Sequence, residues 1–155
     1  MSAPRALGLG AISGLRSLSG PAFVSRAASR GDLNLDGTFL ALLGSPRISK
    51  ALLLMELGEL AGDKLPVAPS RTALPPLLGR AASGGVVGAA VFLSEGRRAT
   101  TGAVLGSSAA VAAAFTGERL RSLVSATTGL PNPVVALAED AIVLLVGFSS
   151  LGGVR

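Results

Sequence analysis

Long apolar runs, separated by short charged or proline-rich stretches, dominate the pattern along this chain. The clearest run covers residues 99–117, which carry no charge and lie between Arg98 and Glu118. At about 1.5 Å per residue, a helix of this length crosses a hydrocarbon core of about 30 Å. The pattern therefore predicts a membrane-spanning helix that begins at residue 99 and ends near residue 121.

Two further runs have the same character. Residues 74–94 carry a single charge, Arg80, and begin with prolines at 75 and 76, where a helix tolerates them. Residues 134–153 are apolar except for the adjacent pair Glu139 and Asp140. Both runs are long enough to span a bilayer.

Two earlier segments are less regular. Residues 6–28 are long enough to span but contain Arg16 and Pro21, and residues 44–62 contain four charges. A polar, turn-rich stretch separates them. We predict an all-α membrane bundle in one domain, residues 1–155, with four helices as the main alternative to five. The five helices are expected near residues 6–28, 44–62, 74–94, 99–121 and 134–153.

Composition supports the membrane prediction. Hydrophobic residues make up 49% of the chain, charged residues only 15%, and mean hydropathy is +0.60. A soluble domain normally carries about 25% charged residues and would lack the polar surface to cover this much apolar material. The expected partner is a lipid bilayer, which the chain is expected to cross several times.

Several chemistries are disfavoured by the residue types. The chain has no Cys and no His, so it has no thiolate and lacks the commonest general base and metal ligand. We expect no enzyme, no cofactor and no metal, with a carboxylate-based membrane enzyme as the improbable exception. The net charge of +5 arises from scattered cations with few aromatics, which is typical of helix ends at lipid headgroups rather than of nucleic-acid binding.

Glycines recur four residues apart in two consecutive predicted helices. Gly84 and Gly88 lie in one, and Gly102 and Gly106 lie in the next. Spacing of four places both glycines of a pair on one helix face, where another backbone can approach closely. We predict close packing of these two helices.

Charge is concentrated in the stretch "ELGELAGDKLPVAPSRT", residues 56–72. Glu56, Glu59 and Asp63 are spaced to share one helix face, and each would cost about 2.5–3.5 kcal/mol if held charged in mid-bilayer without a partner. They therefore require cations: Lys64 and Arg71 are the local candidates, and Arg16 and Arg80 are those from other helices. We expect Arg16 to pair with Glu59. The whole candidate cluster is Arg16, Glu56, Glu59, Asp63, Lys64, Arg71, Glu139 and Asp140.

Four stretches are familiar: "SGLRSLSGPAFVSRAA", "GTFLALLGSP", "ELGELAGDKLPVAPSRT" and "GLPNPVVALAEDAIVLLVG". Together they resemble the bacterial membrane-protein family called domain of unknown function 4126. The resemblance implies a small multi-helix protein of a bacterial cell membrane, whose N-terminal segment belongs to the fold. That segment is otherwise rich in Arg and Ser, as an organelle transit peptide is. The resemblance implies no activity.

Two hypotheses for function remain open. The charged cluster favours transport of an ion or a small solute, since ionisable groups within a membrane commonly serve such roles. The alternative is a structural or assembly protein without transport activity, in which salt bridges fix helix register. A homo-oligomer or a membrane partner fits either hypothesis. For five spans, the cations of the loops divide five against seven, which places the N-terminus outside.

Overall fold

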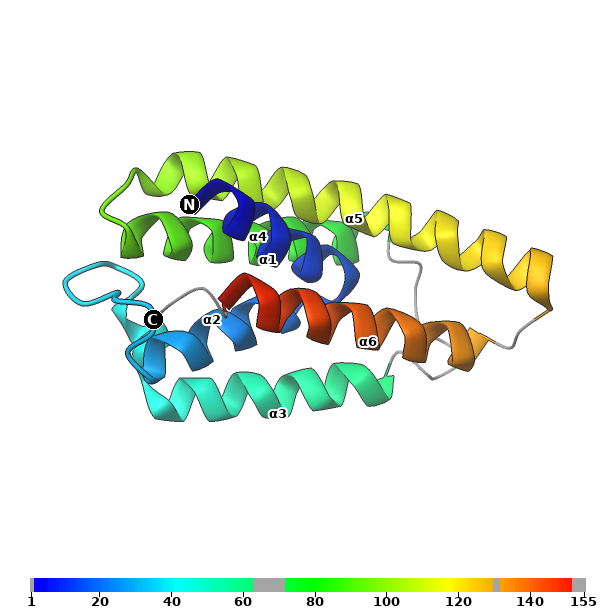
Figure 1. The fold of residues 1–155 in the computed structure, drawn as a ribbon, viewed down its shortest axis with the longest axis horizontal. Helices are drawn as coiled ribbons and strands as arrows, with labels where there is room; N and C mark the ends of the chain where they lie inside the picture. Colours follow the sequence, from blue (N-terminus) through cyan, green and yellow to red (C-terminus); the bar gives the residue numbers. More distant parts are fainter. Residues whose placement is uncertain (1, 63–71, 130–131, 152–155) are drawn as a thin grey trace.

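The computed structural model describes residues 2–62, 72–129 and 132–151, and every regular element in these ranges is a helix (Figure 1). The prediction of an all-α fold is thus confirmed, although the number of helices differs. The described residues form α1 (Ser2–Leu15), α2 (Ser19–Ser29), the short 3-10 helix η1 (Ala41–Gly44), α3 (Pro46–Gly62), α4 (Leu74–Ser94), α5 (Ala99–Thr128) and α6 (Asn132–Leu151).

The helix expected over residues 6–28 is broken into α1 and α2. Pro21 supplies the physical reason, because it has no N–H to donate to the Ser17 carbonyl one helical turn earlier. That carbonyl instead accepts a hydrogen bond from the Ser83 hydroxyl on α4. Residues 16–18 therefore form a turn rather than the middle of one long helix.

The turn reverses the chain, so α1 and α2 form a hairpin. The order in which residues of α1, the turn and α2 contact residues of α6 shows this arrangement. Gly8 of α1 lies beside Ser150 near the end of α6, and Arg16 at the turn reaches Asp140, ten residues earlier in that helix. Phe23 of α2 then packs edge-on against Phe148, with ring centroids 5.4 Å apart. The chain therefore runs beside α6 in one direction as α1 and returns beside it as α2.

Helices α1, α4 and α5 meet at small residues in the core. A Cβ atom placed on Gly84 would lie 2.5 Å from the carbonyl oxygen of Gly106, and one on Gly10 would lie 2.6 Å from the same atom. Gly88 and Gly102 face each other in the same way, one turn further along. No side chain larger than hydrogen fits at these contacts without moving a backbone.

Three helices in the described ranges are long and apolar enough to cross a membrane, rather than the five expected. They are α4, α5 and residues Val134–Leu151 of α6. α5 also continues to Thr128, beyond the expected residue 121, and ends at Gly129, whose φ of 65° suits a glycine cap. In Figure 1, α3 and α5 run in one direction while α4 and α6 run in the other.

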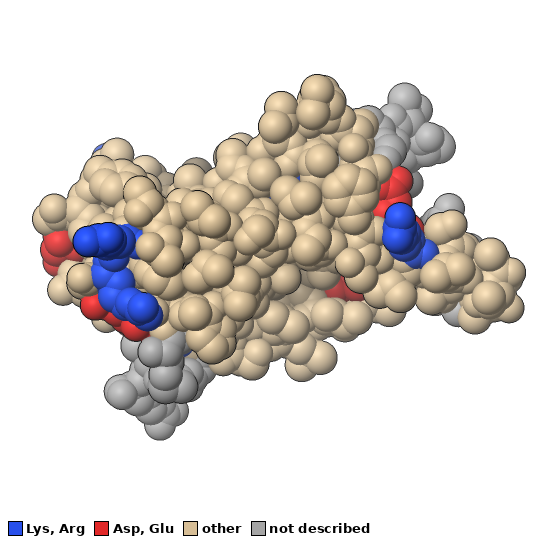
Figure 2. All heavy atoms as spheres, turned by 90° about the horizontal axis from the view of Figure 1, so that it is seen from above, with Lys and Arg blue, Asp and Glu red and all other residues tan. Residues whose placement is uncertain are grey.

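Charged side chains gather toward the two ends of the face in Figure 2, and most of the surface between them is uncharged. Both α1 and α2 have their outer ends at the same end of the molecule (Figure 1). The α4–α5 connection lies there too, since Arg5 of α1 forms an ion pair of 3.7 Å with Glu95. We call this the hairpin-base end; the end of α5 and the start of α6 lie at the opposite end.

Candidate functional site

The turn between α1 and α2 is the centre of the candidate site, because a carboxylate from α3 caps the helix that follows it. The backbone N–H groups of Ser17 and Leu18 donate to the two oxygens of Glu59, at 2.8 and 2.9 Å. The Ser17 hydroxyl donates to the same carboxylate at 2.8 Å. The N-cap residue of α2 is Leu18, and its side chain makes no capping hydrogen bond. Glu59 therefore satisfies donors that the broken helix would otherwise leave without partners.

A guanidinium from α4 caps the helix that precedes the turn. Nη1 of Arg80 donates to the carbonyl oxygens of Gly14 and Leu15, at 2.8 and 2.7 Å. Arg80 is only 5% exposed. Helix C-termini carry partial negative charge, so a buried cation is favourable at this position.

Arg16, within the turn, forms its ion pair with Asp140 of α6. Its Nε donates to Oδ1 of Asp140 at 2.7 Å, and its Nη2 contacts the same oxygen. The Arg16 side chain is 2% exposed and that of Asp140 is 14% exposed. The sequence analysis expected Arg16 to pair with Glu59. In the structure, Arg16 forms an ion pair with Asp140.

Two further carboxylates lie close to the turn. Glu56, one turn before Glu59 on α3, accepts a hydrogen bond from the Ser19 hydroxyl at the start of α2. Glu139, next to Asp140 in the sequence, accepts a hydrogen bond of 2.6 Å from Nη2 of Arg121 on α5. The adjacent pair on α6 therefore faces two different cations, as adjacent helical residues point about 100° apart.

The structure brings five of the eight candidate residues together around the turn: Arg16, Glu56, Glu59, Glu139 and Asp140. The other three, Asp63, Lys64 and Arg71, lie outside the described residues. Sequence reasoning named Arg80 only as an alternative cation for the acidic stretch, and it gave no role to Arg121. The signal for Arg80 was its isolation as the one charge in residues 74–94.

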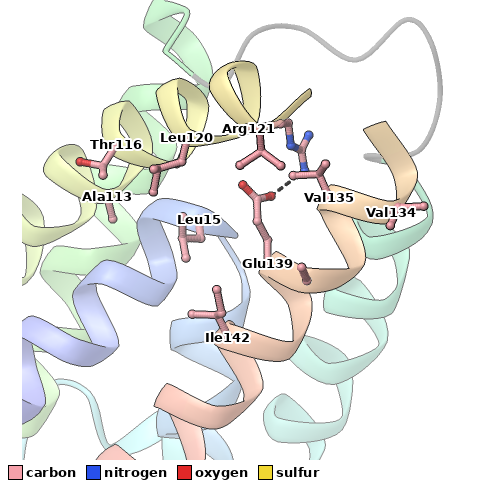
Figure 3. Close-up of a pocket in the computed structure, with 12 residues that line it drawn as sticks. Leu15, Ala113, Thr116, Leu120, Arg121, Val134, Val135, Glu139 and Ile142 are labelled. Carbon is pink, nitrogen blue, oxygen red and sulfur yellow. Dashed lines mark hydrogen bonds and ion pairs between the residues drawn. The ribbon is translucent and has the colours of Figure 1, made fainter. Parts of the chain in front are cut away.

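A cavity of about 450 Å³ opens between α5 and α6 and reaches the end of α1 (Figure 3). Leu15, the last residue of α1, lies at its inner side, while Leu120 and Ile142 point into it. The Arg121–Glu139 ion pair bridges the two helices at its wall. Apart from these two residues the lining is almost entirely apolar.

The chemistry available at this site is limited to carboxylates, guanidinium groups and hydroxyls. Within the parts of the chain that the structure describes, no group of three or more His, Cys, Asp or Glu side chains could hold a metal ion. The site can bind and orient charge, and its carboxylates can exchange protons.

A family model described as Domain of unknown function (DUF4126) matches residues 5–151, nearly the whole chain. The chain belongs to this family. The domain of unknown function 4126 match includes α1 and α2, so the N-terminal helical hairpin is part of the family's domain. No curated protein and no solved structure matches the chain.

Proposed function

We propose that this chain is a multi-pass membrane protein that moves an ion or a small solute past the tip of the α1–α2 hairpin. In this arrangement α3 to α6 cross the bilayer and the hairpin enters from one side only. Three of the four crossing helices meet the length and apolarity of a membrane span. The fourth, α3, runs between the same two ends of the molecule (Figure 1) and turns Glu56 and Glu59 toward the hairpin.

The observation that carries the proposal is the cavity between α5 and α6. It ends at Leu15, the residue before the charged turn, and Glu139 lines it. Non-helical backbone at membrane depth occurs only where protein buries it or where it lines a cavity that water can enter. Discontinuous helices whose ends meet near the middle of the bilayer commonly form the binding sites of transporters. In the proposed arrangement, the turn brings the ends of α1 and α2 together within the bilayer, and the cavity supplies access to Leu15 beside it.

In the proposed mechanism, this conformation is assigned to the closed state of the pathway. The cavity walls are mainly apolar, and hydrophobic constrictions exclude water and ions. Beyond the cavity, the Arg16–Asp140 ion pair and the carboxylate of Glu59 occupy the positions that a charged solute would need. Movement of α6 relative to α5, with separation of Arg121 from Glu139, would open the path.

Flux through proteoliposomes tests the proposal. We expect the purified chain to increase the flux of protons, potassium or chloride, each measured with a fluorescent reporter, over protein-free liposomes. Ala113→Phe should reduce the flux because Ala113 lines the cavity. Ala112→Phe is the matched control, because Ala112 is the residue next to Ala113 on α5, is exposed and does not line the cavity. Equal flux through the two variants would contradict a pathway through this cavity.

A structural role without transport is the second candidate. The specific observation in its favour is that the broken helix ends are satisfied by the chain's own Glu59 and Arg80, rather than left open for a ligand. On this account the purified chain gives no flux above that of protein-free liposomes for any of the three ions. It would instead be recovered from membranes in complex with a partner or with a second copy of itself.

A further inference from the structure

A second apolar depression lies on a different face of the molecule, between α3 and α6. In their described residues, no Cα atom of α3 lies within 8 Å of a Cα atom of α6, and α2 forms the floor between them. The resulting groove has a volume of about 460 Å³. Leu57 on one wall is 60% exposed, and Leu144 and Phe148 on the other are 52% and 66% exposed. The groove therefore opens sideways, toward whatever surrounds the bundle.

The two ends of this groove carry opposite charge. Arg26 and Arg30 line it at the hairpin-base end, one helical turn apart on the same face of α2, and both are exposed. Within the described ranges, no carboxylate lies within ion-pair distance of either guanidinium. At the inner end lie Glu56 and Ser19, which are hydrogen-bonded to each other. Between the ends the walls are apolar.

We propose that this groove binds one anionic phospholipid, with its phosphate between Arg26 and Arg30 and an acyl chain along α2. Basic pockets between membrane helices bind anionic headgroups in this way. The carboxylate of Glu56 orients the lipid, because it repels an anionic headgroup from the inner end. The apolar side chains of Phe23 and Leu144 contact the acyl chain.

The sideways opening favours a lipid over a soluble anion. Leu57, Leu144 and Phe148 would face the hydrocarbon of the membrane, from which an acyl chain enters without crossing water. Free phosphate could use the two guanidinium groups but would leave this apolar surface unfilled. The site rests on the membrane location proposed above, but it does not require transport, so a protein without flux could still bind the lipid.

Native mass spectrometry of the full chain, purified in detergent and stripped of lipid, tests the site. Phosphatidylglycerol should remain bound as a single adduct where phosphatidylcholine, added at the same concentration, does not. The double variant Arg26→Gln/Arg30→Gln should weaken phosphatidylglycerol binding about twenty-five-fold, given about a fivefold contribution from each cation near a phosphate. The variant Leu144→Trp should also weaken it, because the indole fills the groove while both arginines remain.

The matched control is Arg47→Gln/Lys50→Gln, which removes two exposed cations near the start of α3 that do not line the groove. It should bind phosphatidylglycerol as the unmodified chain does. Equal losses in the two double variants would show general attraction to a basic end and overturn the site. Four other results would also overturn the proposed site: equal retention of phosphatidylcholine, unchanged binding by Leu144→Trp, displacement of the lipid by inorganic phosphate, or a dimer mass in place of the lipid adduct.

Discussion

Glu59 binds the turn at residues 16–18, Arg80 binds the end of α1 just before it, and the sign of each charge matches the helix end that it meets. The N-terminus of α2 carries partial positive charge and receives the carboxylate, while the C-terminus of α1 carries partial negative charge and receives the guanidinium. Each ion is thus stabilised by backbone dipoles, and each helix end gains hydrogen-bond partners that the break would otherwise remove.

Substitution of Glu59 tests its role as a cap. Glu59→Leu should destabilise the protein more than Glu59→Gln, because the amide oxygen of Gln can still accept one of the two backbone hydrogen bonds. Each buried N–H left without an acceptor costs about 1–3 kcal/mol. Thermal unfolding in detergent measures the difference. Equal destabilisation by Leu and Gln would indicate that Glu59 acts through its charge alone.

A double-mutant cycle tests the pairing of Arg16. Arg16→Gln or Asp140→Asn alone should cost about 3–5 kcal/mol, because each leaves an opposite charge buried without its partner. The two together should cost much less than the sum of the single effects. The corresponding cycle between Arg16 and Glu59 should show weaker coupling. Stronger coupling to Glu59 than to Asp140 would support the pairing expected from the sequence.

Spacing alone placed Glu56 and Glu59 on one face of a helix, and the structure places both against the hairpin. The sequence alone could not identify the hydrogen-bond donors that these carboxylates accept from. Arg16 lay inside a presumed continuous helix, where its depth relative to α3 and α6 was unknown. Once the chain turns at residues 16–18, the backbone N–H groups of that turn compete with Arg16 for Glu59, and Asp140 becomes the acid that Arg16 reaches.

At the scale of helices, the glycines of α4 and α5 allow two backbones to approach as closely as hydrogen atoms permit. The carbonyl oxygen of Gly106 occupies the space in which side chains at Gly10 and Gly84 would lie. The four-residue spacing predicted the α4–α5 contact, since i and i+4 share a helix face. The same spacing occurs in α1 at Gly10 and Gly14, which pack against Gly106 and Ala110 of α5, but the sequence analysis did not single out that pair.

Alanine substitution should have opposite effects at two glycines. Gly106→Ala should destabilise the bundle, because the new methyl group would collide with the backbone of α4. Gly79→Ala should raise stability by about 0.5–1 kcal/mol, because that glycine is exposed on α4 with no atom within 4 Å of a new Cβ. Thermal unfolding of both variants provides the comparison. A stabilised Gly106→Ala variant would contradict the close approach.

The break between α1 and α2 could have been predicted from one residue, since Pro21 removes a helical donor at the centre of the presumed span. The apolar length of residues 6–28 outweighed that signal. Length distinguishes a crossing helix from a polar loop, but it does not distinguish one crossing helix from two short helices that turn back. The contacts of the turn with α3, α4 and α6 decide this, and they are long-range.

At the scale of the whole molecule, the hairpin changes which charges share a side. With α1 and α2 returning to the same end, the hairpin-base end contains seven described cations: Arg5, Arg26, Arg30, Arg47, Lys50, Arg97 and Arg98. The described cations beyond the apolar run of α5 are Arg119 and Arg121. Moving Arg5 to the other group changes the division of the loop cations expected for five spans from five against seven to four against eight. The N-terminus is then expected on the cytoplasmic side, rather than outside.

Single-cysteine labelling tests the hairpin most directly, since the chain contains no cysteine of its own. Pro4→Cys and Asp36→Cys flank the hairpin at exposed positions, and Thr127→Cys is exposed near the end of α5. In intact cells, a membrane-impermeant maleimide should label only the cysteine at 127. After the inner face is opened, the cysteines at 4 and 36 should both react. Labelling of positions 4 and 36 from opposite sides of the membrane would mean that residues 6–28 cross as one span, and would contradict the account.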